Sequence, residues 1–230
     1  MPASTGALLI NLGTPDAPTV AAVRRYLREF LMDPAVVDLP APARFVLVHG
    51  ILLRVRPKKS AHAYRQVWTE AGSPLLVHGF ALRDAVRTQV AFPVELGMRY
   101  GSPSIRDGLV ALQRQGVQRV VALPLYPQNA NATTGSTEQV LAQETGKLRL
   151  DLRVIPPFHQ RSGFVRAFAH RATGVIDALR PDHVLFSYHG LPERQIRKAC
   201  PPGGVCLQSA SCCDRLEKTN RDCYRAQCFQ

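Results

Sequence analysis

Short apolar runs alternate with amphipathic stretches over most of the chain. The apolar runs predict buried strands at residues 7–11, 92–100, 118–123 and 150–155, with a shorter one at 36–37. Helical spacing predicts helices at residues 20–30 (capped by Thr19), 41–53, 74–89, 104–115, from about 137, and 163–179. Strands that alternate with helices indicate βαβ units and a parallel sheet, so the fold class is α/β.

A further apolar run, 184–186, follows the last of these helices and is expected to be a buried strand. It leads into His189 and Gly190 and stops at Pro192, which cannot continue a strand. Open α/β sheets bind ligands at the carboxyl ends of their strands. His189 is therefore either a functional side chain or a residue that merely caps the strand.

Charge and composition narrow the class of partner. The chain has 230 residues, 46% of them hydrophobic, with 29 Lys and Arg against 17 Asp and Glu, a net charge of +12. Such a charge favours acidic partners, although free use of arginine in a GC-rich genome accounts for part of it. Basic and aromatic residues are not interleaved, so no nucleic-acid partner is expected. The first residues lack the pattern of a signal peptide, and the run 45–53 is too short to span a bilayer, which predicts a cytoplasmic protein.

Three segments are candidates for binding an anionic ligand. The helix 41–53 is followed by Arg54, Arg56 and two lysines, which suits an apolar pocket with a basic rim, an anionic membrane surface, or simply a solvated helix. Asn11, Gly13 and Thr14 lie where the first strand turns into its helix, and the loop 131–136 precedes a helix. Backbone amides at such helix starts bind anions, but they also form ordinary caps.

All six cysteines lie between Cys200 and Cys228. Clustered cysteines in a cytoplasmic protein indicate a bound metal in preference to disulfides. The close pairs typical of zinc sites are missing, so thiolates with looser spacing favour an iron–sulfur cluster, with free thiols as the alternative. The segment 203–205, which contains two glycines, is expected to be flexible enough to wrap around such a cluster.

Six motifs in order resemble those of the ferrochelatase family. They are LINLGTP at 9–15, RRYLREFLMDP at 24–34, GMRYG at 97–101, LYPQ at 125–128, TTGS at 133–136 and SYHGLPER at 187–194. The resemblance implies an enzyme that inserts Fe²⁺ into protoporphyrin IX in the last step of haem synthesis. It also implies two similar Rossmann-like parallel-sheet domains with a porphyrin cleft between them. On this basis residues 1–157 form the first domain, with a cleft lip at about 41–59, and 158–230 begin the second.

The resemblance also implies roles for individual residues. His189 matches the histidine that accepts a pyrrole proton and ligates iron, which suits a neutral imidazole. The lip, with Arg54 and Arg56, is expected to meet the porphyrin propionates and to contact an anionic membrane surface. The other porphyrin contacts implied by position are Asn11, Met98, Arg99, Tyr100, Tyr126, Thr134 and Ser136.

Some bacterial ferrochelatases carry a [2Fe–2S] cluster, and the cysteine segment 200–228 resembles theirs. Cys206, Cys212 and Cys213 are the first three expected ligands, and the fourth is Cys223 or Cys200. Because metal insertion needs no electron, the cluster is expected to be structural or to sense redox state or iron supply.

Two departures from the family pattern affect this interpretation. No residue matches the family's second catalytic group, a glutamate, so we expect a truncated chain with an incomplete active site and second domain. Leu12 stands where the coproporphyrin branch carries a tyrosine, which favours the protoporphyrin branch. The alternatives are another class II tetrapyrrole chelatase and a catalytically incomplete iron–sulfur or porphyrin-binding protein.

Overall fold

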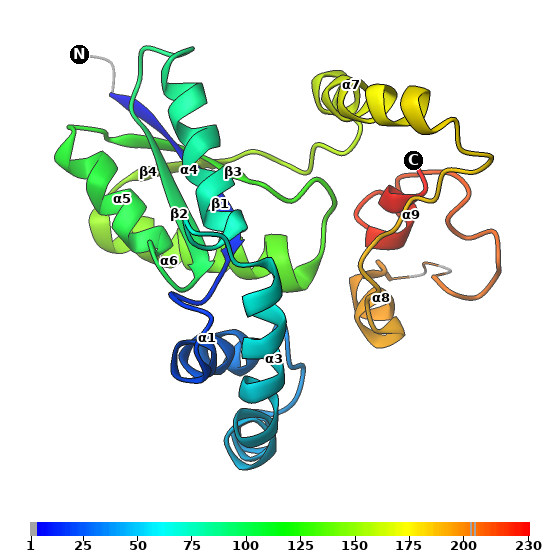
Figure 1. Ribbon diagram of the computed structural model, residues 1–230, viewed down its shortest axis with the longest axis horizontal. Coiled ribbons are helices and arrows are strands. Elements are labelled where there is room, and N and C mark those ends of the chain that lie inside the picture. Colours follow the sequence, from blue (N-terminus) through cyan, green and yellow to red (C-terminus); the bar gives the residue numbers. More distant parts are fainter. Residues whose placement is uncertain (1–3, 203, 205) are drawn as a thin grey trace. The chain divides into compact units, whose positions relative to one another are not determined.

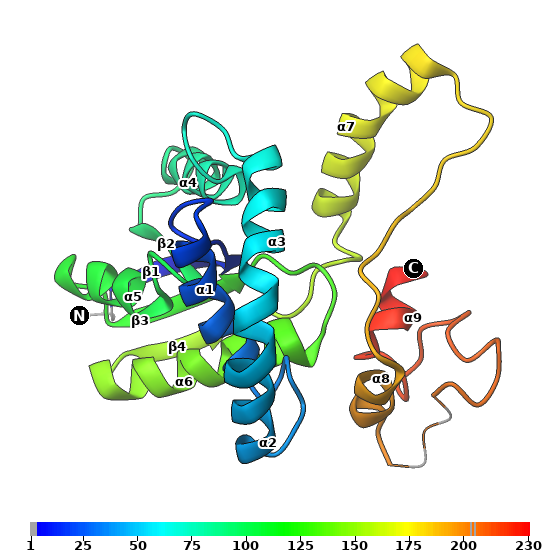
Figure 2. The same cartoon turned by 60° about the horizontal axis from the view of Figure 1, so that its bottom comes forward.

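The computed structural model describes residues 4–202, 204 and 206–230. Its chain divides into two compact units. The first contains the residues up to Leu125 together with Ala132–Pro156, and the second contains Tyr126–Asn131 together with Pro157–Gln230. Figures 1 and 2 show the elements of each unit from two directions.

The first unit is built on a four-stranded parallel sheet, which confirms the α/β prediction. Its strands are β1 (Thr5–Gly13), β2 (Val94–Tyr100), β3 (Arg119–Pro124) and β4 (Asp151–Val154), in the order β2-β1-β3-β4. The chain moves to one side of β1 to form β2 and to the other side to form β3 and β4. Ligands of such sheets bind where the order reverses, which here is between the carboxyl ends of β1 and β3.

Helices cover both faces of this sheet (Figure 1). The helical segments are α1 (Val20–Met32), α2 (Ala41–Phe45), the π-helical η1 (Val46–Leu52), α3 (Leu53–Val67), α4 (Pro74–Arg87), α5 (Ile105–Arg114), the π-helical η2 (Asn131–Gly135) and α6 (Ser136–Leu148). Helices α5 and α6 pack on the face that contains Leu8 and Ile10, and α4 packs on the face that contains Leu9 and Leu96. The alternation of successive side chains in β1 therefore supplies two separate cores.

Local sequence explains where the helices begin. The side chain of Thr19 accepts a hydrogen bond from the N–H of Ala22 at the start of α1, as predicted. Ser104 and Asp107 form a reciprocal capping box at the start of α5. None of the helices in the described part of the chain is both long and apolar enough to cross a membrane.

Two predictions for the first unit are wrong. Residues 36–37 form a turn, not a strand, because the N–H groups of Val36 and Val37 both donate to the carbonyl of Asp33. The helix predicted over 41–53 is instead a continuous helical run that extends to Val67, with the π-helical η1 inside it. The basic stretch after residue 53 continues as helix because lysine and arginine are good helix formers.

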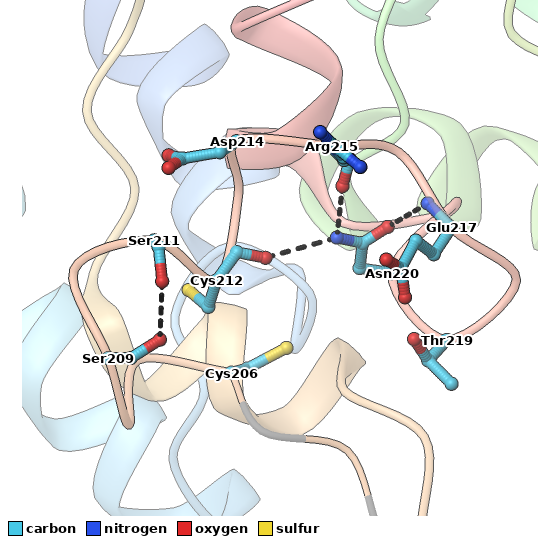
Figure 3. A pocket seen from close by; sticks show the side chains of 9 residues that line it. All are labelled: Cys206, Ser209, Ser211, Cys212, Asp214, Arg215, Glu217, Thr219 and Asn220. Carbon is cyan, nitrogen blue, oxygen red and sulfur yellow. Dashed lines mark hydrogen bonds between the residues drawn. The ribbon is translucent and has the colours of Figure 1, made fainter.

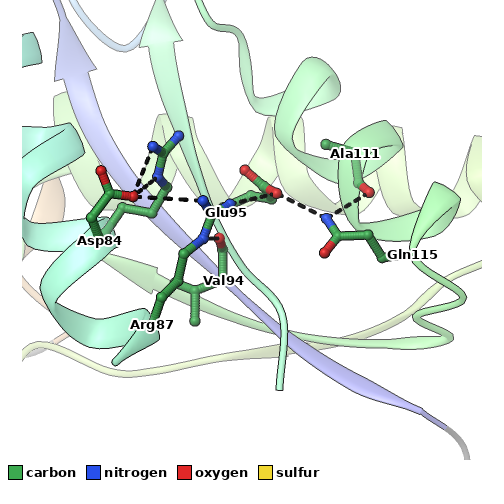
Figure 4. A network of polar contacts seen from close by, with 7 residues as sticks. Asp84, Arg87, Val94, Glu95, Ala111 and Gln115 are labelled. Atoms are coloured by element: carbon green, nitrogen blue, oxygen red, sulfur yellow. Dashed lines mark hydrogen bonds and ion pairs between the residues drawn. The ribbon is translucent and has the colours of Figure 1, made fainter. Parts of the chain in front are cut away.

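A polar network joins α4, β2 and α5 on the surface of the first unit (Figure 4). Arg87 donates to the carbonyl of Val94 and to the carboxylate of Glu95, each at 2.8 Å, and Gln115 donates to the same carboxylate at 2.8 Å. Asp84 pairs with Arg87 at 3.5 Å. Asp84 is exposed, so its ion pair with Arg87 contributes little to stability, whereas Glu95 is only 14% exposed and links α4 and the end of α5 to β2.

The second unit consists of short helices and loops. It contains α7 (Ser162–Leu179), α8 (Glu193–Ala199) and α9 (Tyr224–Cys228), and its small core includes Ile196, Cys213, Cys223 and Ala226. The strand predicted at 184–186 is not formed, since the described residues of this unit include no strand with which it can pair. Its side chains are exposed, with 92% of Leu185 accessible to solvent.

Candidate functional site

A buried polar cluster lies near the carboxyl end of β2 in the first unit. Its centre is Asp33, the residue that follows α1. One carboxylate oxygen, Oδ2, accepts hydrogen bonds from the hydroxyl of Tyr100 at 2.8 Å and from that of Ser136 at 2.6 Å, and it also pairs with the guanidinium of Arg99. The other oxygen accepts from the N–H of Ala35 at 2.7 Å. The cluster therefore joins the end of α1, the end of β2 and the start of α6.

The electrostatics of this cluster are balanced internally. Burial acts to raise the pKa of Asp33, but the hydrogen bonds from Ser136, Ala35 and Tyr100 and the charge of Arg99 lower it below its ordinary value. Burial raises the pKa of Tyr100, so the phenol stays protonated and donates. Arg99 also donates to Ser136 at 2.7 Å and stacks over the ring of Tyr100. Its charge is thus largely neutralised by Asp33.

The structure brings three of the predicted porphyrin-contact residues together here, namely Arg99, Tyr100 and Ser136. Sequence reasoning missed Asp33, although it lies in one of the quoted motifs. A carboxylate directly after a helix resembles an ordinary capping or turn residue, and its three partners lie 66, 67 and 103 residues away. Only the tertiary structure shows that they meet.

Other predicted contacts of the first unit lie in different environments. Met98 is fully buried in the core with Leu9 and Leu96. Asn11 is partly exposed near the end of β1, where its side chain accepts from the N–H of Leu12 at 2.8 Å. Thr134 is 5% exposed, and within the described residues its buried hydroxyl has no hydrogen-bond partner. Arg54 and Arg56 are both exposed on α3.

In the second unit, His189 lies in an exposed loop between α7 and α8, with no regular secondary structure. Tyr126, the first residue of the second unit, is 9% exposed. Burial raises the pKa of Tyr224 to about 12, and the main chain of His189 lies beside its hydroxyl. The histidine loop therefore approaches the cysteine segment, because Tyr224 follows Cys223 directly.

The cysteines line two cavities in the second unit. The larger, of about 390 Å³, includes Cys206 and Cys212 in its wall (Figure 3). The smaller, of about 120 Å³, is lined by Cys200, Cys206 and Cys223. Cys206 is common to both, so four thiols from distant positions of the segment lie around adjoining spaces.

The local folding of this segment depends on Asn220, which was not singled out from the sequence. Its side chain donates to the carbonyls of Cys212 at 3.1 Å and Arg215 at 2.9 Å, and accepts from the N–H of Glu217 at 2.7 Å (Figure 3). Arg225 contacts the sulfur of Cys212 at 3.7 Å. A cation beside a thiol stabilises the thiolate form that a metal requires.

The cysteine thiols are the side chains that would bind the predicted [2Fe–2S] cluster. All six cysteines are free thiols, and burial together with its neighbour Cys200 raises the pKa of Cys206 to about 12. Among the described residues, no three metal-binding side chains converge tightly enough to hold a single ion. A [2Fe–2S] cluster instead takes four thiolates, and the thiols around the two adjoining cavities, Cys200, Cys206, Cys212 and Cys223, provide that number of donors. Gly203 and Val205, part of the segment predicted to wrap the cluster, lie outside the described residues.

The fold and the sites define a parallel α/β protein with a buried ion pair near the carboxyl edge of its sheet and a cysteine-rich second unit. The sequence pattern of the ferrochelatase family matches residues 4–230, nearly the whole chain, and the chain belongs to that family.

Comparison with individual proteins supports this family membership. The chain is 49% identical to a ferrochelatase of Azotobacter vinelandii, an alignment that covers 97% of this chain and 67% of the relative. It is 43% identical to one of Coxiella burnetii, covering 98% and 63%, and 45% identical to one of Stutzerimonas stutzeri, covering 97% and 66%. The chain thus spans about two thirds of the length of these curated relatives.

Proposed function

We propose that this protein is a ferrochelatase that inserts Fe²⁺ into protoporphyrin IX to form protohaem, the last step of haem synthesis. The observation that carries the proposal is the family match over residues 4–230, which includes the motif around His189. The names of the relatives point to the same reaction. Position 12 is a leucine, where the coproporphyrin branch carries a tyrosine, and this difference supports protoporphyrin as the substrate.

His189 is the proposed catalytic residue. Metal insertion requires two pyrrole protons to leave the macrocycle, and a neutral imidazole accepts a proton near pH 7 and also binds Fe²⁺. The exposure of His189 supports this role, because an acceptor must be reachable by a large planar substrate. The substrate site is proposed as a cleft between two related domains, 1–157 and 158–230.

The porphyrin is an apolar disc that carries two propionates. The exposed guanidinium groups of Arg54 and Arg56 are the proposed propionate contacts, since each is available for a charge-assisted hydrogen bond. Arg99 is paired with Asp33, so its proposed role is to hold Tyr100 and Ser136 in the wall of the site. Asn11, Tyr126 and Thr134 complete the proposed contacts, and Met98, which is fully buried, is proposed to support the site from the core.

We further propose that the cysteine segment holds a [2Fe–2S] cluster with a structural or sensing role. The ligands supported by the cavities are Cys206, Cys212 and Cys223, with Cys200 as the fourth in preference to Cys213. Cys213 lines neither of these two cavities, whereas Cys200 lines the smaller one together with Cys206 and Cys223. When bound, the cluster supplies a covalent brace and a one-electron redox centre.

The proposed location is the cytoplasm, with peripheral contact to an anionic membrane surface. Phe45, Val46, Ile51 and Val55 expose between 54% and 68% of their surface on the helical run from α2 to α3. Arg54 and Arg56 stand among them. Apolar side chains beside cations are the pattern of helices that lie in a membrane interface.

The proposal is tested by anaerobic iron insertion with the whole protein, because no residue among these 230 matches the family's second catalytic glutamate. Haem formation from protoporphyrin IX is measured beside coproporphyrin III and sirohydrochlorin. Turnover with protoporphyrin IX is expected, and His189→Ala should abolish it while porphyrin binding, followed by fluorescence quenching, persists. Porphyrin binding without turnover would select the binding-protein alternative. Turnover with sirohydrochlorin alone would select another chelatase, and near-normal turnover of His189→Ala would remove the catalytic assignment.

A further inference from the structure

The loop that leaves the sheet after β3 is tied to the cysteine segment by side-chain hydrogen bonds. The N–H of Asn129 donates to Oε1 of Gln227 at 2.6 Å. The side-chain amide of Asn129 donates to the carbonyl of Asp222 at 3.0 Å. Both partners belong to the same compact unit as the loop, although they lie more than 90 residues further along the chain.

Gln227 uses both ends of its amide group in this contact. While Oε1 accepts from Asn129, Nε2 donates to the carbonyl of Arg221 at 2.5 Å. The side chain is 3% exposed, so a lost partner would leave a buried polar group unsatisfied. A fully buried glutamine with donor and acceptor both engaged is a specific connector, not a surface residue.

The three hydrogen bonds enclose Cys223. Two of them are accepted by the carbonyls of Arg221 and Asp222, the two residues before it, and the third is accepted by the side chain of Gln227, one helical turn after it. Cys223 itself is 4% exposed, and its N–H donates to the carbonyl of Asn220 at 2.8 Å. A shift of the Cys223 backbone therefore moves the groups that hold Asn129.

The loop is also fixed from its other side. The N–H groups of Phe158 and His159 both donate to the carbonyl of Pro127 at 3.0 Å. The loop is therefore held at two points, at Pro127 by residues 158–159 and at Asn129 by the residues around Cys223, and only the second point involves the cysteine segment. Tyr126, a proposed porphyrin contact, is in the same six-residue stretch.

We propose that Asn129 and Gln227 couple the cysteine segment to the loop Tyr126–Asn131, so that thiolate metal binding at Cys223 sets the order of this loop. The inference rests on the proposed role of Cys223 as a cluster ligand. Binding a metal fixes the Cys223 sulfur and with it the neighbouring carbonyls. Since packed hydrogen-bonded contacts move as units, the change reaches the N–H of Asn129. Gln227 is a positioning residue in this arrangement and contacts no substrate.

The test measures amide hydrogen exchange in the loop of the complete chain. Exchange is compared after anaerobic assembly with iron and sulfide, after chelation, and with Zn²⁺ alone as a second thiolate-binding probe. We expect metal loading to slow exchange of the Asn129 amide at least tenfold. Gln227→Leu should retain the visible absorbance of the cluster but lose this response, whereas Gln208→Leu, an exposed glutamine of the same segment, should respond like the parent protein.

The outcomes separate this coupling from the proposed function. Metal uptake without a change in loop exchange, or an unchanged response in Gln227→Leu, would overturn the coupling alone. No uptake of either metal would overturn both the cluster assignment and the coupling, while leaving the iron-insertion assay to decide the chelatase activity. If Gln227→Leu does not fold, Asn129→Ala removes only the side-chain bond to Asp222 and should weaken the response; an unchanged response there would also count against the coupling.

Discussion

The hydroxyl of Ser136 donates to the carboxylate of Asp33 at 2.6 Å, across 103 residues of sequence. This bond joins the start of α6 to the end of α1, and Arg99 and Tyr100 bring β2 to the same oxygen. A single buried carboxylate thus holds three elements near the carboxyl edge of the sheet. Replacing Asp33 should therefore change the geometry of that edge more than replacing a charged residue on the surface would.

Asp33→Asn tests the importance of this ion pair. The substitution keeps the size of the side chain but leaves the largely buried guanidinium of Arg99 without its counter-charge, since only 14% of that side chain is exposed. We expect the free energy of unfolding, measured by urea denaturation, to fall by about 3 kcal/mol. The exposed pair of Asp16 and Arg25 provides the control, and Asp16→Asn should cost less than about 1 kcal/mol. Equal effects of the two variants would show that the cluster is not a special anchor.

The lowered pKa of Asp33 predicts how this contribution depends on pH. A carboxyl group whose pKa is lower in the folded than in the unfolded state, about 3.9, contributes fully above the unfolded value. The contribution is lost as the pH falls through the folded-state pKa. The stability difference between the parent protein and Asp33→Asn should therefore be constant from pH 7 to 5 and smaller at pH 3. A difference that grows on acidification would have the wrong sign for this mechanism.

The regular elements of the first unit followed from the sequence because each is encoded locally. The strands are short apolar runs, and Thr19 and Ser104 mark helix starts with their own side chains. The turn at 36–37 was missed because β-branched valines suggest a strand, while the backbone instead folds onto the carbonyl of Asp33. The intrinsic strand preference of valine does not include such hydrogen bonds to a neighbouring carbonyl.

The sites were less predictable because they depend on contacts between distant residues. The sequence identified Arg99, Tyr100 and Ser136 only through resemblance, and it gave no sign of the carboxylate that joins them. Residues 184–186 show the opposite problem. Their pattern is that of a buried strand, but a strand forms only against hydrogen-bonding neighbours, and among the described residues of the second unit there are none.

Gly108 tests the packing of α5 on the sheet. A Cβ atom at this position would lie 2.5 Å from a methyl group of the fully buried Leu8 and 3.1 Å from the carbonyl oxygen of Leu96. Gly108→Ala should therefore lower the free energy of unfolding by about 1–3 kcal/mol. Gly146, inside α6, has no atom within 4 Å of such a Cβ, so Gly146→Ala should raise stability by about 0.4–1 kcal/mol. Thermal unfolding distinguishes the two, and a stabilising Gly108→Ala would contradict the close packing.

The choice of the fourth cluster ligand is open to a direct comparison. Cys200 shares a cavity with Cys206 and Cys223, whereas Cys213 lines neither of the two cysteine cavities, although its sulfur lies 3.5 Å from that of Cys212. After anaerobic assembly, Cys200→Ser should lose the visible absorbance and bound sulfide of the cluster. Cys213→Ser should retain both. The opposite result would assign the ligand role to Cys213 and leave Cys200 as a neighbouring thiol.

The exposed helical run from α2 to α3 predicts binding to anionic lipid. Burial of a large apolar side chain contributes roughly 1.5–3 kcal/mol, so Phe45→Ser with Ile51→Ser should reduce co-sedimentation with phosphatidylserine-containing vesicles more than tenfold. Phe92→Ser, at a phenylalanine of similar exposure in the loop before β2, should have little effect. Replacing Arg54 and Arg56 by glutamine should weaken binding to anionic vesicles but not to neutral ones, and added salt should reproduce that loss because it screens exposed charges. Equal binding by all these variants would show that this surface does not meet a membrane.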